Sequence, residues 1–389
     1  MHRLMAQLKR LMIAGISAFI PNRVIRKRVR HFLKDLQLVD VVTAINFRRL
    51  KIDSKSVLII ELNPCHGEVI PGYIDYFRRL GYAVDVLVNQ DVARENPLVR
   101  MEEGTFRLFS SKPTGFSLFL SPAALERYAC VFLATAKSYV FPKTAPAVID
   151  KFPQLLNHRN LICVEHDLAD VAWHREEELL RDNRVVTLGR FTKGILVNPH
   201  VFGTIAITAK STPVRFLVVC ATGRSREGLG LIQTLLEVVK VVPTIQIVIV
   251  GLNTFSVPDV LRSQVVIKGR LSFEALFDEV EQASFILALL NPENPLHERY
   301  LTTSVSGALQ LSYGFRKPLV IQRRFADHYG FTSSTAVVYE QDLRDAMLVA
   351  IGMSLPDYAA MQGELGRTAD VLYEESLSNL RQMAEGMGR

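Results

Sequence analysis

The sequence has little cysteine, and several signatures of ligand binding are missing from it. None of the cysteines forms a CxxC pair, which excludes a disulfide framework and a zinc site of that kind. Most of them lie in or beside apolar runs, as expected for reduced core thiols of a cytosolic protein. No Asp-x-Asp string and no Walker A lysine loop occurs, so neither a metal nor another cofactor is expected. The four cysteines are Cys65, Cys130, Cys163 and Cys220.

Long disordered or low-complexity stretches are also missing. Hydrophobic residues make up 49% of the chain and charged residues 22%, which is an ordinary globular composition. At about 100–200 residues per domain, a chain of 389 residues has room for two or three domains.

Acidic residues are absent from residues 1–34, which contain nine of the 46 lysines and arginines. The rest of the chain holds 37 basic and 39 acidic residues, so the formal charge of +7 belongs to this arm and not to the body. A general nucleic-acid-binding surface would spread basic residues over the fold. No nucleic-acid partner is therefore expected.

The arm also carries apolar residues at helical spacing between Leu4 and Ile20. Its uncharged stretch, Leu11–Asn22, is 12 residues long, whereas a membrane-spanning helix needs about 20. The pattern predicts an amphipathic helix in the plane of a membrane, followed by a polybasic segment that binds an anionic membrane surface. A helix packed on the protein's own surface is the alternative.

From Ser56 onward, short apolar runs alternate with amphipathic segments, and this alternation predicts βαβ units with parallel sheets. The runs expected to form strands are 56–62, 83–89, 130–135, 161–167, 184–189, 214–221, 245–251, 265–269, 285–290, 318–322 and 336–340. The expected helices are 73–80, 123–128, 175–182, 230–242, 273–283, 306–315, 343–353 and 356–386. The fold class is α/β, with two Rossmann-like domains.

We divide the chain into a basic arm and helix (1–50), two Rossmann-like domains (51–210 and 211–355) and a C-terminal helix (356–389). Ligands in such sheets bind beyond the carboxyl ends of the strands. The loops that follow the predicted strands are therefore where a site is expected.

In the first half, Gly67 and Glu68 follow the strand 56–62, and Gly67 would let the backbone approach an anion at a helix start. A plain strand-to-helix turn is the alternative for this loop. His166 follows the strand-like run LICVE at the mouth of the expected cleft, where a histidine is better placed for a ligand than for the core. A structural histidine is the other interpretation.

In the second half, Arg224 and Arg226 follow the strand 214–221, and their guanidinium forks suit the oxygens of a diphosphate. Small polar residues then precede the helix 306–315, in a composition typical of a phosphate site at a helix N-terminus. Upstream of them, Glu298 and Arg299 are candidates for contacts to a sugar or a base. An N-capping cluster with solvated charges is the alternative. The small polar residues are Thr302, Thr303, Ser304, Ser306 and Gly307.

The order of these predicted strands, helices and polar loops resembles that of a glycosyltransferase of the GT-B fold. The resemblance is close to the retaining class called group 1 or family 4 and to its bacterial surface-polysaccharide members. The resemblance covers about residues 55–352 and is stronger in the second half. It rests on TGRSREG (222–228), IVIVG (247–251), VIKGRLSFEALFDEVEQASFILALL (266–290) and SGALQLSYGFRKPLVI (306–321).

The resemblance implies that residues 51–210 bind the acceptor and residues 211–355 the nucleotide-sugar donor. It also implies that the C-terminal helix packs back on the N-terminal domain. It assigns the donor diphosphate to Arg224, Arg226 and the helix start 303–307, and it places the family's cleft histidine at His166. Gly67, Glu68, Arg299 and Thr302 are expected to contact donor or acceptor.

The sequence departs from the family at two glutamates spaced eight residues apart, because Thr303 and Leu311 occupy those positions. Glu298 is expected to take over a catalytic contact to the sugar, with Glu293 as a weaker candidate. Catalysis would be largely electrostatic and would need no metal, because the basic pair and the helix start stabilise the leaving diphosphate.

The function implied is transfer of a sugar from a nucleotide diphosphate donor to a glycan or lipid-linked acceptor in polysaccharide biosynthesis. The enzyme would be cytoplasmic and peripheral on the inner face of the cell membrane. Two alternatives stay open. The missing glutamates favour a non-catalytic GT-B scaffold of a polysaccharide assembly complex, and a nucleotide-sugar epimerase shares the fold.

Overall fold

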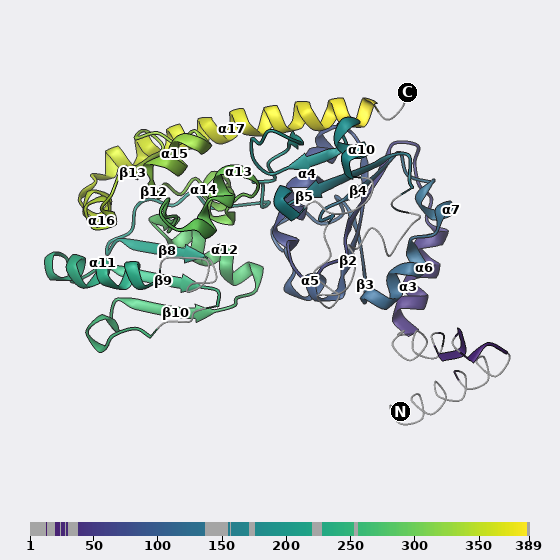
Figure 1. Cartoon of the computed structure of the whole chain (residues 1–389), viewed down its shortest axis with the longest axis horizontal. Helices are drawn as coiled ribbons and strands as arrows, with labels where there is room; N and C mark the ends of the chain where they lie inside the picture. Colours follow the sequence, from purple (N-terminus) through teal and green to yellow (C-terminus); the bar gives the residue numbers. More distant parts are fainter. Residues whose placement is uncertain are drawn as a thin grey trace.

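The computed structural model describes residues 38–136, 157–170, 176–219, 228–252 and 256–386, with scattered positions between 13 and 29 and at 155. Two α/β domains lie side by side, and a long C-terminal helix runs along both (Figure 1). The two Rossmann-like domains predicted from the sequence are thereby confirmed. Most of the basic arm, Cys220, Arg224 and Arg226 lie outside the described residues.

The N-terminal domain is built on a sheet of seven parallel strands in the order β3-β2-β1-β4-β5-β6-β7. Its strands are β1 (Ser56–Glu61), β2 (Ala83–Asn89), β3 (Arg107–Ser111), β4 (Cys130–Leu133), β5 (Leu161–Glu165), β6 (Val185–Thr187) and β7 (Ile195–Leu196). Its helices are α3 (Leu38–Arg49), α4 (Ile70–Arg79), α5 (Gln90–Glu95), α6 (Phe116–Phe119), α7 (Pro122–Leu125) and α10 (Glu176–Arg181). Short 3-10 helices are η1 (Gly67–Val69), η2 (Pro113–Gly115) and η3 (Leu168–Asp170).

Strand β1 shows why the continuous apolar runs become central strands. All six of its residues are buried, because successive side chains enter the cores on opposite faces of the sheet. Leu58 and Ile60 join the cluster under α3, α6 and α7, whereas Val57 and Ile59 join the cluster under α4 and α5. Cys130 and Cys163 are buried free thiols, and Cys65 is a half-buried one.

The C-terminal domain repeats the design with six parallel strands in the order β10-β9-β8-β11-β12-β13. The strands are β8 (Arg215–Val219), β9 (Gln246–Val250), β10 (Val265–Gly269), β11 (Phe285–Leu287), β12 (Leu319–Gln322) and β13 (Ala336–Tyr339). The helices are α11 (Gly228–Val241), α12 (Phe273–Gln282), α13 (Arg299–Thr302), α14 (Gly307–Phe315), α15 (Arg323–Tyr329) and α16 (Leu343–Gly352), with η4 (Asp259–Leu261) and η5 (Pro295–His297). The order reverses between β8 and β11, where doubly wound sheets leave a crevice for ligands.

Helix α17 (Leu355–Gly386) packs on both domains. Near its start, the Tyr358 hydroxyl donates to the Ser284 carbonyl, 2.6 Å away, in the C-terminal domain. Near its end, Leu380 is fully buried in the core under α4, and the Asn379 amide donates to the Leu196 carbonyl of β7 at 2.9 Å. This one helix therefore ties the two cores together.

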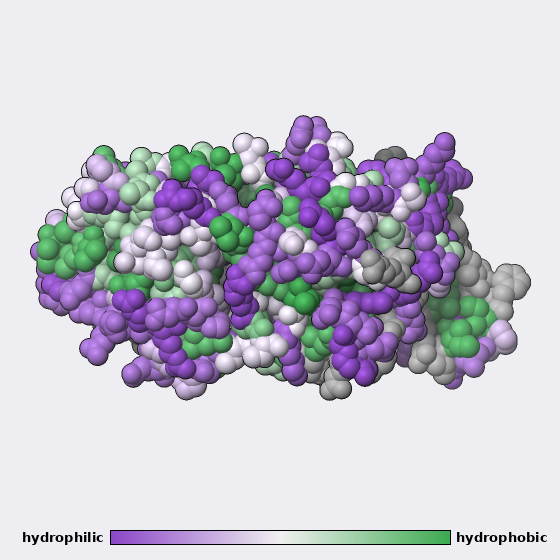
Figure 2. Space-filling view, turned by 90° about the horizontal axis from the view of Figure 1, so that it is seen from above, coloured by the Kyte–Doolittle hydropathy of each residue, from purple (hydrophilic) through white to green (hydrophobic). Residues whose placement is uncertain are grey.

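Viewed from the side of α17, hydrophilic residues cover most of the surface, and an apolar area lies at the end that carries α11 and α16 (Figure 2). Within the described part of the chain, no helix is both long and apolar enough to cross a membrane.

Candidate active site between the two domains

The carboxyl ends of three neighbouring strands meet at the edge of the first sheet. Glu61 ends β1, Thr135 follows β4 and His166 follows β5, and these strands are adjacent in the sheet. Because all three strands are parallel, their ends lie on the same edge. The three side chains form one hydrogen-bonded group there.

Glu61 is completely buried at the base of this group. The Asn63 backbone N–H and side-chain amide both donate to Glu61 Oε1, at 2.7 and 3.0 Å, and the Thr135 hydroxyl donates to Oε2. Burial raises the pKa of Glu61 to about 7, although the hydrogen bonds from Thr135 and Asn63 act in the opposite direction. The carboxyl group therefore titrates close to neutral pH.

His166 is held from the inner side through one ring nitrogen. Its Nε2 lies 2.9 Å from the Ala134 carbonyl oxygen and 3.2 Å from the Thr135 hydroxyl oxygen. Burial, together with the positive charge of His66, lowers the pKa of His166 to about 3. The imidazole is therefore neutral at physiological pH and can accept a hydrogen bond.

His66 lies beside His166, with ring centroids 4.1 Å apart and ring planes inclined by 33°. Burial disfavours its charged form, but hydrogen bonds to Cys65 and Glu68 raise its pKa well above the usual value. The pKa of Glu68 is lowered by the same contact, in which its Oε1 lies 3.5 Å from His66 Nδ1. A charged and a neutral imidazole therefore stand side by side.

The backbone of His66 is left-handed, with φ of 63°. For a residue other than glycine this conformation costs about 1–3 kcal/mol, and such residues are concentrated at functional sites. This left-handed conformation turns the chain sharply after β1, and the turn places the His66 imidazole against that of His166.

Gly67 is packed tightly under this turn. A Cβ atom at this position would lie 2.8 Å from Val92 Cγ1 and 3.1 Å from Pro97 Cγ, with Phe273 of the C-terminal domain at 3.4 Å. These contacts by themselves require glycine. The ligand contact predicted for Gly67 stays a prediction.

The C-terminal domain reaches this edge through the segment 299–304. Arg299 forms an ion pair with the buried carboxylate of Asp167, and the Leu168 N–H donates to the Thr303 carbonyl at 2.9 Å. Asp167 and Ser304 also form an isolated antiparallel bridge. The structure therefore brings the predicted residues Arg299, Thr303 and Ser304 against Asp167 and Leu168, which directly follow His166.

Helix α14 begins directly after this contact. Ser306 is its buried N-cap residue, and the space around Gly307, where a Cβ would point, is open to at least 4 Å. The first N–H groups of a helix have no partner within the helix and attract anions. The hydroxyls of Thr302 and Thr303 instead bond to carbonyls one turn back in α13, at 3.1 and 3.4 Å.

Glu298 and Leu311 are placed away from this contact. Glu298 is exposed and forms an ion pair with Arg324 at 3.3 Å. Leu311 is buried in the core between α12 and α14, where a carboxylate would have no solvent.

A cavity of about 490 Å³ lies at the carboxyl edge of the second sheet, beyond β11, β12 and β13. Three carboxylates, from Glu293, Glu340 and Asp342, are part of its lining, together with the side of α11 near its start. Carboxylates accept hydrogen bonds from hydroxyl groups. The cavity therefore has the polarity to hold a sugar or a ribose.

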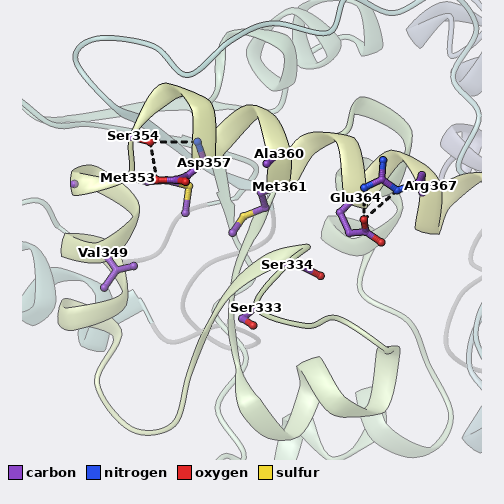
Figure 3. A pocket seen from close by; sticks show the side chains of 11 residues that line it. Ser333, Ser334, Val349, Met353, Ser354, Asp357, Ala360, Met361, Glu364 and Arg367 are labelled. Atoms are coloured by element: carbon purple, nitrogen blue, oxygen red, sulfur yellow. Dashed lines mark hydrogen bonds and ion pairs between the residues drawn. The ribbon is translucent and has the colours of Figure 1, made fainter.

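A larger open groove of about 820 Å³ lies at the opposite edge of this sheet, between α16, α17 and the residues before β13 (Figure 3). Its polar side chains pair with one another: Ser354 bonds to Asp357 at 2.6 Å, and Arg367 bonds to Glu364. Ligands of such sheets bind at the carboxyl edge. This groove is therefore not the expected site.

Sequence reasoning missed Glu61 and Thr135 as members of the site, and it singled out the loop of His66 for its glycine and not for the imidazole. A signal for Glu61 was present, because a carboxylate within a run predicted to be buried has to be protonated or hydrogen-bonded. Thr135 carries no such signal, because its role depends on two other strands. Arg224 and Arg226 were predicted, and they lie outside the described residues.

No protein-family model and no curated protein matches the sequence. Solved structures do match. An α-glucosyltransferase in complex with UDP-glucose and DNA containing an abasic site is 11% identical, with 83% of this chain and 96% of that chain covered and a TM-score of 0.54. A point mutant of TarM from S. aureus, in complex with Fondaparinux, alpha-GlcNAc-glycerol and UDP, is 9% identical, with coverages of 85% and 99% and a TM-score of 0.50. At these identities the similarity shows the fold, which is the two-domain GT-B fold.

Proposed function

We propose that this chain is a glycosyltransferase that takes a sugar from a nucleoside diphosphate donor in the C-terminal domain and passes it to an acceptor in the N-terminal domain. One observation carries the proposal. The segment leading into α14 touches Asp167 of the other domain, one residue after His166, so the start of α14 and the pair of histidines lie close to one contact between the domains.

The donor half is proposed to hold the diphosphate at the start of α14, with Ser304, Ser306 and Gly307. Backbone N–H groups and the helix dipole favour negative charge there, and they would stabilise the diphosphate as it leaves. Arg224 and Arg226, which follow β8, would complete the site as bidentate partners. With these groups in place the reaction needs no metal. Both named complexes reported above contain UDP or UDP-glucose.

On the acceptor side, neutral His166 would accept a hydrogen bond from the attacking hydroxyl, and the charged His66–Glu68 pair would orient it. Arg299 and Thr302 of α13 are proposed to contact the donor or the acceptor, and the ion pair of Arg299 with Asp167 supports this for Arg299. Transfer with retention of configuration is proposed from the resemblance to family 4.

The acceptor is proposed to be a glycan or a lipid-linked sugar at the inner face of the cell membrane. The basic arm supports this proposal by its composition. Helix α3, which follows the arm, adds two exposed apolar residues one turn apart, Val42 and Ile45, and two basic residues in its last turn, Arg48 and Arg49. A surface of this kind suits an anionic lipid interface.

A non-catalytic scaffold of a polysaccharide assembly complex is the second candidate. The two family glutamate positions favour it, because Thr303 and Leu311 carry no carboxylate and Leu311 is buried. Glu298, the expected replacement, is engaged in an ion pair with Arg324.

Thermal unfolding with a panel of nucleoside diphosphates and nucleotide sugars tests the proposal. A ligand at about 100 times its Kd adds about 2.7 kcal/mol of stability, so one base is expected to raise the Tm. The double variant R224A/S306A should lose this rise. The matched control is S354A. Ser354 directly precedes α17, its hydroxyl accepts a hydrogen bond from the Asp357 N–H, and it lies in the remote groove of Figure 3. No rise with any nucleotide would favour the scaffold.

A further inference from the structure

Glu61 and Thr135 belong to the site, but no step of the proposed transfer uses them. Both are buried, with exposed fractions of 0% and 1%. A fully buried carboxyl group is costly unless it is hydrogen-bonded. Glu61 accepts three hydrogen bonds, which offset this cost. The third comes from the Thr135 hydroxyl, which also contacts His166.

The direction of each hydrogen bond follows from the groups involved. An ionised carboxylate can only accept, so the Thr135 hydroxyl donates its hydrogen to Glu61. The hydroxyl has no second hydrogen, so its oxygen can only accept from His166 Nε2, 3.2 Å away. The Ala134 carbonyl, 2.9 Å from the same nitrogen, can also only accept.

Two acceptors therefore face Nε2 of His166, and this nitrogen has to carry the proton of the neutral ring. We propose that Glu61 and Thr135 are positioning residues for His166, which hold its imidazole as the Nε2–H tautomer and leave Nδ1 as the nitrogen that accepts from a sugar hydroxyl in the cleft. The tautomer follows from the hydrogen bonds alone, whereas its use in transfer rests on the proposed function.

The hydrogen bonds form a chain from Asn63 through Glu61 and Thr135 to His166, so the orientation of each group sets that of the next. Asn63 holds Oε1 of Glu61 with two donors, which directs Oε2 toward Thr135. In E61Q, the amide oxygen would stay with Asn63 and the amide N–H would donate to the Thr135 oxygen. The Thr135 hydrogen would then turn toward His166 Nε2 and favour the other tautomer.

The test is a two-bond proton–nitrogen NMR correlation on the full chain labelled with ¹⁵N-histidine, at pH 8.5, where Glu61 is ionised. The signals of His166 are identified by their loss in H166N. We expect the Nε2–H pattern in the native protein and a measurable Nδ1–H fraction in E61Q, where the Thr135 hydrogen competes for Nε2. T135V and T135S should both keep the native pattern, because the Ala134 carbonyl still accepts from Nε2 and nothing donates to it.

A matched control is T187V, which removes the hydroxyl of another buried threonine at the end of a neighbouring strand. Thr187 donates to the Gly189 carbonyl at 3.0 Å and is 1% exposed. This variant should leave the His166 signals unchanged. If E61Q does not fold, the native protein at pH 5.5 takes its place, because Glu61 is protonated there and His166 is still neutral.

An Nδ1–H pattern in the native protein would overturn the proposal, and so would a native pattern in E61Q. The measurement needs no nucleotide sugar, so its outcome is separate from that of the Tm panel. If a transfer reaction is found, T135V should lower kcat about tenfold with little change in the KM of the donor, and T135S should recover it.

Discussion

Arg299 of the C-terminal domain forms an ion pair with Asp167 of the N-terminal domain, one residue after His166. Asp167 is 7% exposed in its side chain, whereas Arg299 is 49% exposed. The buried carboxylate is thus neutralised by a guanidinium that solvent still reaches. The contact joins the two domains at the point where a donor and an acceptor would meet.

Removing this ion pair should weaken the protein modestly. R299Q leaves Asp167 with the Ala169 N–H as a partner but without a positive charge, and we expect a loss of about 1 kcal/mol in the free energy of unfolding. Urea unfolding measures it. The matched control R324Q removes an ion pair exposed on both sides, to Glu298, and should cost clearly less. Equal losses in the two variants would contradict the burial argument.

The buried carboxyl group of Glu61 should make stability depend on pH. Its pKa is raised by burial from about 4.5 to about 7, so the folded state keeps a proton that the unfolded chain releases in this range. The native protein therefore loses stability as pH rises from about 4.5 to 7, by about 3 kcal/mol at most. E61Q has no such titration, so the difference between the native protein and E61Q should shrink over this range.

Urea unfolding of both proteins at pH 5, 6, 7 and 8 measures that difference. Comparing the two curves removes the contributions of His66 and His166, which titrate in both. The Thr135 hydrogen bond lowers the pKa of Glu61, so T135V should move the pH range upward. Parallel curves for the native protein and E61Q would show that Glu61 does not titrate near neutral pH.

Gly67 should not tolerate a methyl group. In G67A, the new Cβ would lie 2.8 Å from Val92 Cγ1, and relief of this contact is expected to cost about 1–3 kcal/mol. G363A is the contrasting variant, because Gly363 lies on the exposed side of α17 with nothing within 4 Å of the new Cβ. It should stabilise the protein by about 0.5–1 kcal/mol. A neutral G67A in thermal unfolding would show that the turn after β1 can move.

The basic arm should hold the protein on anionic membranes. Deletion of residues 1–34 removes nine basic residues, and we expect loss of sedimentation with vesicles that contain anionic lipid. The full chain on neutral vesicles is the control for charge. Binding that survives the deletion would place the membrane contact elsewhere, for instance on α3.

The sequence by itself determined the two domains and the loops at the carboxyl ends of their strands. Runs such as SVLIIE of β1 are short, have four consecutive apolar residues and are rich in β-branched side chains, and these features favour a buried strand. The edge strand β3 (RLFSS) escaped this reasoning, because an exposed edge tolerates polar residues. The two-residue strand β7 is too short to leave a pattern. The helix start 303–307 was readable because hydroxyls and glycine gather there locally.

Only the tertiary structure decided which of these groups act together. Glu61 and Thr135 are 74 residues apart, and Asp167 and Arg299 are 132 residues apart. Their contacts depend on the order of the strands and on how the two domains close, and a local pattern contains neither. The need for glycine at position 67 likewise arises from Val92 and Pro97, in and just after α5, and from Phe273 of the other domain. Local propensity determined the helices and strands, whereas long-range packing brought the residues of the candidate site together.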